Sequence, residues 1–248
     1  RDDVESRGLG DVYKRQECTH EYWRSNGKFT PNITLRLASG GYIGGGLYHS
    51  QNLEGALTTL PGARIVCPSF ADDAAGLLRT SMRSKGFTLY LEPKALYNSV
   101  EAAAVVPEEF EVPFGKARIR REGTDLTIIT YGNTTHFCLD VAERLAREGV
   151  GSVEVIDLRS LIPLDKEAIF ASVRKTGKVM VVHEDKVFSG FGAEIAAQIA
   201  GEMFRYLDAP VQRVGSTFTP VGFNPILERA ILPNDEKIYN AAKELLEF

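Results

Sequence analysis

The chain has 248 residues, 44% of them hydrophobic, enough to build one large globular domain or two of ordinary size. Its formal net charge of −4 shows no basic excess, so nucleic acid and anionic membrane surfaces are excluded as expected partners. No apolar run approaches the roughly 20 residues of a membrane helix, and the N-terminus lacks the apolar core of a signal peptide. Three widely spaced cysteines without a C-x-x-C pair predict a reducing compartment, the bacterial cytoplasm or, for a eukaryotic source, the mitochondrial matrix.

The first 16 residues differ from the rest of the chain. They are polar and show no hydrophobic period, whereas the residues that follow do. The run "DVYKRQ" at 11–16 can be encoded by a transposon end that is used in preparing sequencing libraries. We interpret residues 1–16 as an artefactual tail, with an ordinary disordered tail as the alternative.

Residues 17–97 alternate between strand and helix patterns. Turn residues separate the segments, and we expect the second segment, a helix, to end at Pro61. The segments, in chain order, are the strand "NITLRLASGG", the helix "SQNLEGALTTLPG", the strand "ARIVCPS", the helix "ADDAAGLLRTSMRSKG" and the strand "FTLYLEP". This alternation predicts an α/β layer with a parallel sheet.

Residues 98–116 form a predicted linker, because Pro107 and Pro113 bracket an acidic stretch and interrupt both periods. Residues 117–248 then repeat the alternation more regularly and predict a complete three-layer α/β domain with a mostly parallel sheet. The expected strands are "DLTIITYG", "SVEVIDL", "KVMVVHED" and "VQRVGS". The expected helices are one capped by Asn133 or Thr134, "KEAIFASVRKTG" capped by Asp165, "GAEIAAQIAGEMF", and a final helix from Asn234 to Phe248.

Two motifs of this second region favour structural roles. The run "GFGAEI" at 190–195 opens a helix but lacks the third glycine of a dinucleotide fingerprint, so we interpret it as a turn and cap. His136 lies in the first turn of a helix and His183 at the end of a buried strand, and we interpret both as structural or interface residues.

The run "GGLYHSQNLEG" at 45–55 presents a different histidine. Glycines precede His49, and Tyr48, Ser50 and Gln51 surround it with hydrogen-bonding side chains at a junction between a loop and a helix. No cysteine or aspartate stands near enough in sequence to suggest a metal set or a triad. A functional histidine and a plain helix cap by Ser50 are both open on this spacing alone.

The residues from "YHSQNLEGALTTLPGARIVCPS" to "FTLYLEPKALY" resemble the β subunit of the thiamin-diphosphate-dependent 2-oxo acid dehydrogenases, the E1 component of the pyruvate and branched-chain complexes. The runs "VPFGKARIRREGTDLTIITYG", "EVIDLRSLIPLD", "GAEIAAQIA" and "YLDAPVQRV" continue the resemblance, which covers about 21–248. It implies the back half of a pyrimidine-binding domain at 17–97, followed by a transketolase-type C-terminal domain at 117–248.

The resemblance also implies an activity. The chain would be the β part of an αβ enzyme that oxidatively decarboxylates a branched-chain or pyruvate-like 2-oxo acid and acylates lipoyl groups. In this family the histidine of the H-S-Q motif stands where the lipoyl arm enters, so His49 would pass a proton to the dithiolane sulfur. Tyr48, Ser50 and Gln51 would line the lipoyl channel.

The partners and cofactors implied by the resemblance are an E1 α subunit or α half, a second β copy, the lipoyl and subunit-binding domains of the E2 acyltransferase, and thiamin diphosphate with Mg²⁺. The family's activating glutamate has no counterpart in residues 1–44, and the G-D-G motif that holds the diphosphate belongs to the α subunit. We therefore expect the isolated chain to be inactive. The alternatives are a non-catalytic docking module for the acyltransferase core and another enzyme of the transketolase superfamily.

Two further sites are implied by the resemblance. Carbonyls of the loop before "FTLYLEP" would bind a monovalent cation such as K⁺, although Ser84 replaces an acidic residue that is common there and Lys85 adds a positive charge. An ordinary helix end is the alternative. The acidic end of the last helix would dock the subunit-binding domain, since negative charge is unfavourable there for the helix itself. The residues concerned are Ser81, Met82, Ser84 and Gly86 for the cation, and Glu244, Glu247 and Phe248 for docking.

Overall fold

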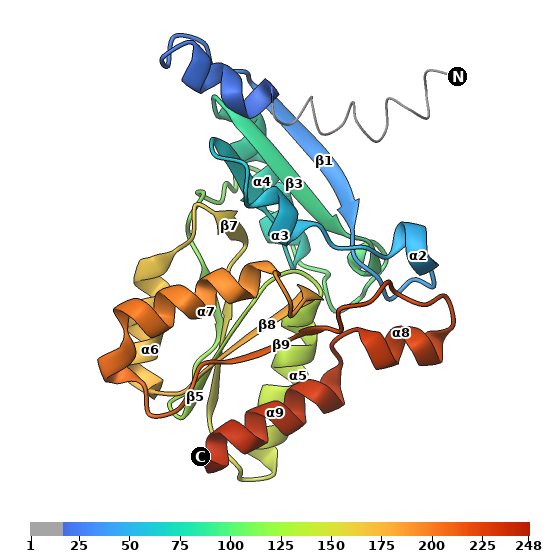
Figure 1. Ribbon diagram of the computed structural model, residues 1–248, viewed down its shortest axis with the longest axis vertical. Coiled ribbons are helices and arrows are strands. Elements are labelled where there is room, and N and C mark those ends of the chain that lie inside the picture. The colour runs from blue at the N-terminus through green and yellow to red at the C-terminus, as the bar shows by residue number, and fades with distance from the viewer. Residues whose placement is uncertain (1–16) are drawn as a thin grey trace.

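A computed structural model describes residues 17–248, and the predicted tail at 1–16 lies outside the described residues. The described residues form two sheets that are stacked along the long axis of the molecule (Figure 1). A helix at 17–24 covers the far end of the first sheet, where the Trp23 indole lies 3.4 Å from the Pro61 carbonyl oxygen.

The first sheet has the order β1-β3-β2-β7. Its central strand β3 reads "FTLYLEP" and is buried almost throughout, because helices cover one face and the second sheet's elements the other. The strands β1, β3 and β2 are parallel, whereas β7 comes from the second half of the chain and pairs antiparallel with β2. The bounds are β1 (Ile33–Ser39), β2 (Ala63–Val66), β3 (Phe87–Pro93), β7 (Ser160–Ile162) and the long helix α4 (Ala71–Arg83).

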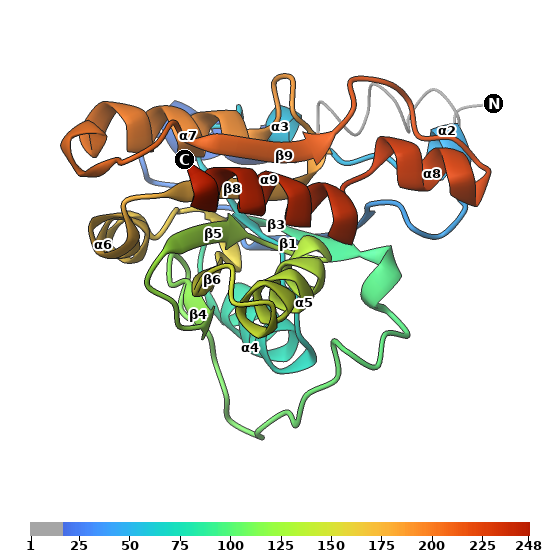
Figure 2. The same cartoon turned by 90° about the horizontal axis from the view of Figure 1, so that it is seen from below.

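The second sheet has the order β4-β6-β5-β8-β9 and is parallel except for its edge strand β4. Two pairs of helices cover its two faces, so the predicted three-layer α/β architecture is confirmed. Figure 2 shows α7 on one side of the strands and α5 on the other. The strands are β4 (Arg118–Arg121), β5 (Leu126–Thr130), β6 (Val153–Asp157), β8 (Val179–Lys186) and β9 (Gln212–Ser216). The helices are α5 (Thr134–Arg147), α6 (Lys166–Thr176), α7 (Phe191–Glu202) and α9 (Asp235–Glu247).

Capping residues fix several of these helices. The Asp165 carboxylate accepts a hydrogen bond from the Ala168 amide at 3.2 Å, and the Asn234 side chain accepts one from Lys237 at 3.1 Å. Gly177 ends α6 with a φ of 67°, in the left-handed region that favours glycine. Asn133 makes no side-chain cap, because the Thr134 hydroxyl turns inward to Thr130 at 2.8 Å.

One predicted helix is wrong in extent. The segment "SQNLEGALTTLPG" contains only the short helix α3 (Glu54–Leu57), and Leu53 rather than Ser50 precedes it. Ser50 instead follows α2 (Gly46–His49), and its buried hydroxyl has no hydrogen-bond partner. The residues between α2 and α3 are tied to the residue that follows β1, since the Gly40 amide donates to the Gln51 carbonyl at 3.2 Å.

Short elements that have no strong period escaped prediction. These are the edge strand β4, the three-residue β7, the helix at 17–24, and the helix α8 (Pro225–Ile231), which begins at Asn224. Residues 97–117 contain neither a helix nor a strand. The sequence between β9 and α8 is rich in turn residues, which hides the short helix from a periodicity argument.

The two sheets share one apolar core. Leu89 of β3 and Ile65 of β2 are fully buried in the same cluster as Ile129 and Val181 of the second sheet. A buried ionic network adds to this interface: Asp73 of α4 contacts Arg120 of β4 and Arg159 beyond β6. The two halves therefore fold against each other as one unit.

Candidate functional site

The His49 loop, residues 40–52, lies where β1 ends and the two halves of the chain meet (Figure 1). Its short helix α2 carries His49 and Tyr48 outward, and Tyr48 is 88% exposed. Ser50 is buried beneath them, while the Gln51 amide donates to the Leu47 carbonyl at 3.0 Å. The four predicted residues are thus brought together, with His49 free to meet a partner from solvent.

Glycines at the start of this loop allow an acidic side chain to approach the backbone. The Gly41 amide donates to Oε1 of Glu184, and a Cβ added at Gly40 would lie 2.8 Å from the same oxygen. Gly40 also has a φ of +86°, which disfavours other residues. A Cβ at Gly41 would lie 2.7 Å from Leu232. Gly40 therefore needs to be glycine for this backbone conformation, whereas a side chain at Gly41 would require the Leu232 side chain to move.

Three consecutive residues at the end of β8 hold the loop. Besides Glu184, the Asp185 carboxylate accepts from the Gly55 amide at 2.9 Å, and the Lys186 ammonium donates to Oε1 of Gln51 at 3.2 Å. Sequence reasoning missed these roles. The signal was present in the charged run "HEDK" at the end of an otherwise apolar strand.

A second set of contacts comes from α8 and from the segment after β3. The Gly44 amide lies 3.3 Å from Oε1 of Glu228, and the Tyr42 hydroxyl donates to the Pro233 carbonyl at 2.6 Å. On the other side, the Lys94 ammonium donates to the His49 carbonyl oxygen. The backbone that carries His49 is therefore fixed from three directions, while its imidazole stays exposed.

A small cavity of about 10 Å³ lies behind the loop, between Glu54, Glu184 and Tyr131. This volume admits about one water molecule. Oε2 of Glu54 and the Tyr131 hydroxyl both lack a partner, so such a water would have polar neighbours. Burial raises the pKa of Glu54 to about 8 and that of Glu184 to about 7. Asp185 adds a like charge beside Glu54.

The raised pKa of Glu54 predicts a pH-dependent stability. Between about pH 4.5 and pH 8 the folded chain holds a proton that the unfolded chain releases, so the free energy of unfolding falls as pH rises. We expect Glu54→Gln to abolish this contribution and to raise the free energy of unfolding at pH 8 by about 2 kcal/mol or more, with little change at pH 5. Urea unfolding at both pH values measures this, with exposed Glu167→Gln as control. An equal change at both pH values would contradict it.

His136 and His183, the two histidines of the second half, contact neighbouring backbone. Nε2 of His136 lies 2.8 Å from the Ser69 carbonyl oxygen and so joins α5 to the first half of the chain. His183 is fully buried against Gly190 and Gly192, where an added Cβ would lie within 3 Å of its ring. Burial lowers the pKa of His183 to about 4, which keeps the imidazole neutral.

Of the predicted cation-binding residues, Ser81 and Met82 lie in the last turn of α4, and Ser84 and Gly86 follow the helix. The Ser81 hydroxyl donates to the Leu77 carbonyl at 2.7 Å, and the Gly86 carbonyl accepts from the Ile33 amide at 3.3 Å. Met82 is 73% exposed, and the Ser84 amide closes the last turn of the helix. A Cβ at Gly86 would lie 3.0 Å from the Arg64 guanidinium, so a fixed positive charge already adjoins the loop.

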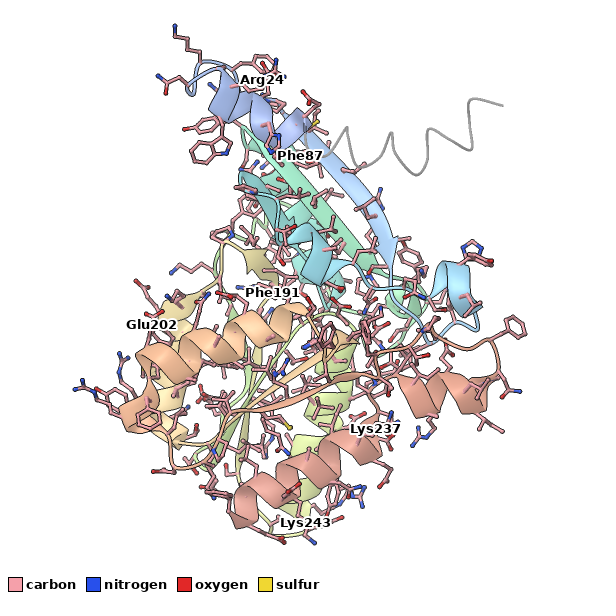
Figure 3. The ribbon with its side chains drawn as sticks, viewed as in Figure 1. Arg24, Phe87, Phe191, Glu202, Lys237 and Lys243 are labelled. Carbon is pink, nitrogen blue, oxygen red and sulfur yellow. The ribbon has the colours of Figure 1, made fainter. Side chains whose placement is uncertain are left out.

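The predicted docking residues lie at the exposed end of α9. Phe248 is 72% exposed, Glu244 and Glu247 are exposed, and Lys243, labelled in Figure 3, lies 3.9 Å from the Glu247 carboxylate. Phe248 also borders an apolar hollow of about 630 Å³ that is lined by the alanines of α7 and the segment after it, Ala196, Ala197, Ala200, Phe204, Leu207 and Val211. The end of the chain thus joins an acidic helix terminus to an apolar surface.

None of the helices in residues 17–248 combines the length and apolar character required to cross a membrane. Within the same residues, no three His, Cys, Asp or Glu side chains are grouped so that they could hold a metal ion.

Comparisons with known proteins agree on one family. The family model "Transketolase, C-terminal domain" matches residues 115–238. The 2-oxoisovalerate dehydrogenase subunit beta of Bacillus subtilis (strain 168) is 40% identical over 91% of this chain and 69% of its own length. The pyruvate dehydrogenase E1 component subunit beta is 39% identical in Bacillus subtilis and 41% identical in Staphylococcus aureus (strain Mu50 / ATCC 700699), over the same shares.

A solved structure shows the same fold. The protein described as "Split gene transketolase, inactive beta4 tetramer" superimposes with a TM-score of 0.75 at 22% identity. The match covers 98% of this chain and 73% of that one. The arrangement of both sheets is therefore that of a transketolase-like chain.

Proposed function

The chain belongs to the E1 β-subunit family of the thiamin-diphosphate-dependent 2-oxo acid dehydrogenases, and from this premise we propose that His49 serves acyl transfer to the lipoyl arm. The substrate would be a branched-chain or pyruvate-like 2-oxo acid. The observation that carries the proposal is the exposed imidazole of His49 on a loop whose backbone is held from three sides. Such a group can donate a proton to an incoming dithiolane sulfur while the loop keeps its place.

Thiamin diphosphate would lie between this chain and an α partner. The cavity behind the His49 loop holds about 10 Å³, so the space at this loop does not by itself enclose a group of that size. This chain would therefore supply one wall of the cofactor site. The Mg²⁺ ion would be held by the partner, and K⁺ at the end of α4 rests on the family resemblance alone.

Exposed apolar side chains around His49 support an α partner at this face. Leu47, Phe223, Ile226 and Leu227 are each more than half exposed, and Phe223 lies beside the backbone of Gly46. Large exposed apolar groups that cluster in this way mark interaction surfaces. The proposed assembly also contains a second β copy. The proposed location is a reducing cytoplasm, which the three unpaired cysteines support.

The proposed function is tested by reconstitution. Residues 17–248, joined to the activating-glutamate region of a bacterial branched-chain or pyruvate dehydrogenase β subunit and co-expressed with its α subunit, are expected to decarboxylate 2-oxoisovalerate or pyruvate and to acylate a lipoyl domain. The chain alone is expected to give no turnover. Turnover by the chain without an α partner would contradict the proposal. A lack of turnover in every stable αβ pair would contradict it as well.

The alternative, a docking module for the acyltransferase core, is favoured by the acidic and apolar end of the chain. A basic segment of the subunit-binding domain would pair with Glu244 and Glu247, and its apolar side chains would cover the hollow beside Phe248. This docking is compatible with catalysis by the same αβ enzyme.

Removing Glu247 and Phe248 is therefore expected to weaken binding of the subunit-binding domain by about tenfold at low salt. The loss should shrink as ionic strength rises, because salt screens exposed charge pairs. Titration calorimetry measures the affinity, and activity with an artificial electron acceptor should stay unchanged. Exposed Glu167→Gln, on α6, serves as control. Unaltered affinity at low and moderate salt would rule out this docking role.

A further inference from the structure

Two lysine side chains meet the carbonyl end of α2, the short helix that ends at His49. Lys94 donates from its ammonium group to the His49 carbonyl oxygen. The Lys186 ammonium donates to Oε1 of Gln51 at 3.2 Å, and the side-chain amide of the same Gln51 donates to the Leu47 carbonyl at 3.0 Å. One carbonyl of α2 is thus held directly by a lysine, and another through a relay.

The carbonyl end of α2 needs partners from outside the helix. The helix contains only Gly46–His49, so it ends before residues further along the chain can donate to its last carbonyl oxygens. Hydrogen bonds from ionised donors are stronger than those between neutral groups. The two ammonium groups therefore supply contacts that a four-residue helix cannot make for itself.

The two lysines belong to elements of different sheets. Lys94 opens the single helical turn η1 (Lys94–Leu96) directly after β3, the buried central strand of the first sheet, and Lys186 is the last residue of β8 in the second. Figure 1 shows α2 at the edge of the molecule, beside the ends of β1 and β3. Both lysines are half-buried, whereas His49 is exposed. The lysines therefore hold the helix backbone and leave the imidazole free.

We propose that Lys94 and Lys186 are positioning residues for His49, which hold the carbonyl end of α2 from two sheets and thereby aim the imidazole at an incoming lipoyl arm. The inference rests on the proposed function for what His49 does there, but not for the two tethers themselves. It also gives Gln51 an internal role, as the link through which Lys186 acts.

The effect on chemistry follows from the short reach of a proton donor. Donor and acceptor must come within hydrogen-bond distance of each other, and a displacement of about 1 Å can remove much of the effect of a catalytic group. A helix of four residues that has lost one of its tethers is free to shift by such a distance. We therefore expect loss of either lysine to slow acyl transfer without any direct contact between that lysine and the lipoyl arm.

Carbonyl signals of the histidines test the Lys94 tether in the chain itself. The sequence contains four histidines, so ¹³C labelling of their carbonyl carbons gives four NMR signals, and the signal missing from His49→Ala identifies His49. Lys94→Met removes the donor but keeps a long side chain. We expect it to shift the His49 signal, because a carbonyl carbon responds to the hydrogen bond that its oxygen accepts. Lys94→Arg keeps a charged donor and should shift this signal less.

The other histidines serve as internal controls. His136 and His183 lie in the packed second half, so their signals should stay in place in every variant that folds normally. The matched control, Lys28→Met, alters an exposed lysine of the first half and should leave the His49 signal unchanged. An unchanged His49 signal in Lys94→Met would overturn the direct tether.

The relay through Gln51 has its own signal. Lys186→Met is expected to shift the side-chain amide signals of Gln51, whose oxygen would lose its charged partner. These signals should stay in place in Lys28→Met. Unchanged Gln51 signals in Lys186→Met would overturn the relay.

Kinetics of an active αβ enzyme, assembled as for the proposed function, test the link to His49. Lys94→Met and Lys186→Met are each expected to lower kcat for lipoyl acylation by about tenfold, with KM for the lipoyl domain unchanged. Lys94→Arg should recover most of the loss. Activity with an artificial electron acceptor should stay constant in all three variants.

Two other roles for these lysines predict different kinetics. If their charges attracted an acidic lipoyl domain, both methionine variants would raise KM, and the increase would shrink with added salt. If they only stabilised the fold, activity with the artificial acceptor would fall as well. Either outcome would overturn the positioning of His49.

The two measurements separate this inference from the proposed function. If the NMR signals shift but lipoyl acylation is unchanged, the positioning of His49 is overturned and the proposed function is not. Failure of reconstitution would contradict the proposed function and leave the two tethers standing.

Discussion

Replacing His49 with alanine is expected to slow acylation of the lipoyl domain by about 100-fold in an αβ enzyme that carries residues 17–248 together with the family's activating glutamate. Decarboxylation with an artificial electron acceptor should be nearly unchanged. The difference arises because a proton donor for the dithiolane sulfur serves only the second half-reaction. Stopped-flow or steady-state rates with a lipoyl domain, compared with dye reduction, measure the two steps.

Replacing His49 with alanine is expected to leave the position of the loop unchanged. The His49 imidazole is exposed, and the contacts that hold its residue in place are made by the backbone, whose carbonyl accepts from Lys94. Alanine is also well tolerated in a short helix such as α2. His20→Ala, in the exposed helix at 17–24, is the matched control and should affect neither step. Equal losses in both assays with an intact fold would make His49 a structural residue.

The regular elements around this site could be predicted because their determinants are local. The α6 helix is bounded by Asp165, whose carboxylate caps the first turn, and by Gly177, whose φ of 67° ends the last. The buried strands β5 and β8 are apolar runs between turn residues, and they pair as the alternation of strands and helices requires. Each of these signals lies within one short segment of sequence.

The His49 loop could be predicted only in part, because its conformation depends on distant residues. A helical pattern begins at Ser50, yet Gly41, Gly55 and Gln51 each bond to the end of β8, 130 or more residues further along the chain. Those contacts interrupt the helix that local preference favours, so that only Glu54–Leu57 is helical in this segment. The strand β7 escaped prediction for the same reason, since its pairing with β2 exists only after the two halves meet.

The candidate site, too, was predictable only where its determinants are local in sequence. The exposure of His49 follows from the glycines and polar residues next to it, and the structure agrees. The acidic set around the cavity has no sequence spacing to reveal it, because Glu54 and Glu184 lie 130 positions apart and adjoin only in the folded chain. A buried acid in a mostly apolar strand was the one available signal.

Asp73→Asn is expected to lower the free energy of unfolding by about 3–5 kcal/mol, as for other buried ion pairs that lose one partner. Asp73 is fully buried in the first turn of α4, where it contacts Arg120 and accepts from Arg159 at 2.8 Å. The side chains of both arginines are no more than 10% exposed. Asparagine keeps the shape but leaves the Arg120 guanidinium with the carboxylate of Asp157 alone and the Arg159 guanidinium with backbone carbonyl oxygens only.

Asp72→Asn on the same helix turn is the matched control. Its partner Arg118 lies 3.0 Å away with 46% of its side chain exposed, so solvent screens the pair and a loss below about 1 kcal/mol is expected. Urea unfolding followed by circular dichroism compares the two variants. If both lower the free energy of unfolding by a similarly small amount, the stabilising role of the buried ionic network is contradicted. Asp73 belongs to the first half of the chain, whereas both buried arginines belong to the second. Loss of the Asp73 carboxylate should therefore also separate the unfolding transitions of the two halves. That separation would disturb the His49 loop too, since the loop is held by residues of both halves.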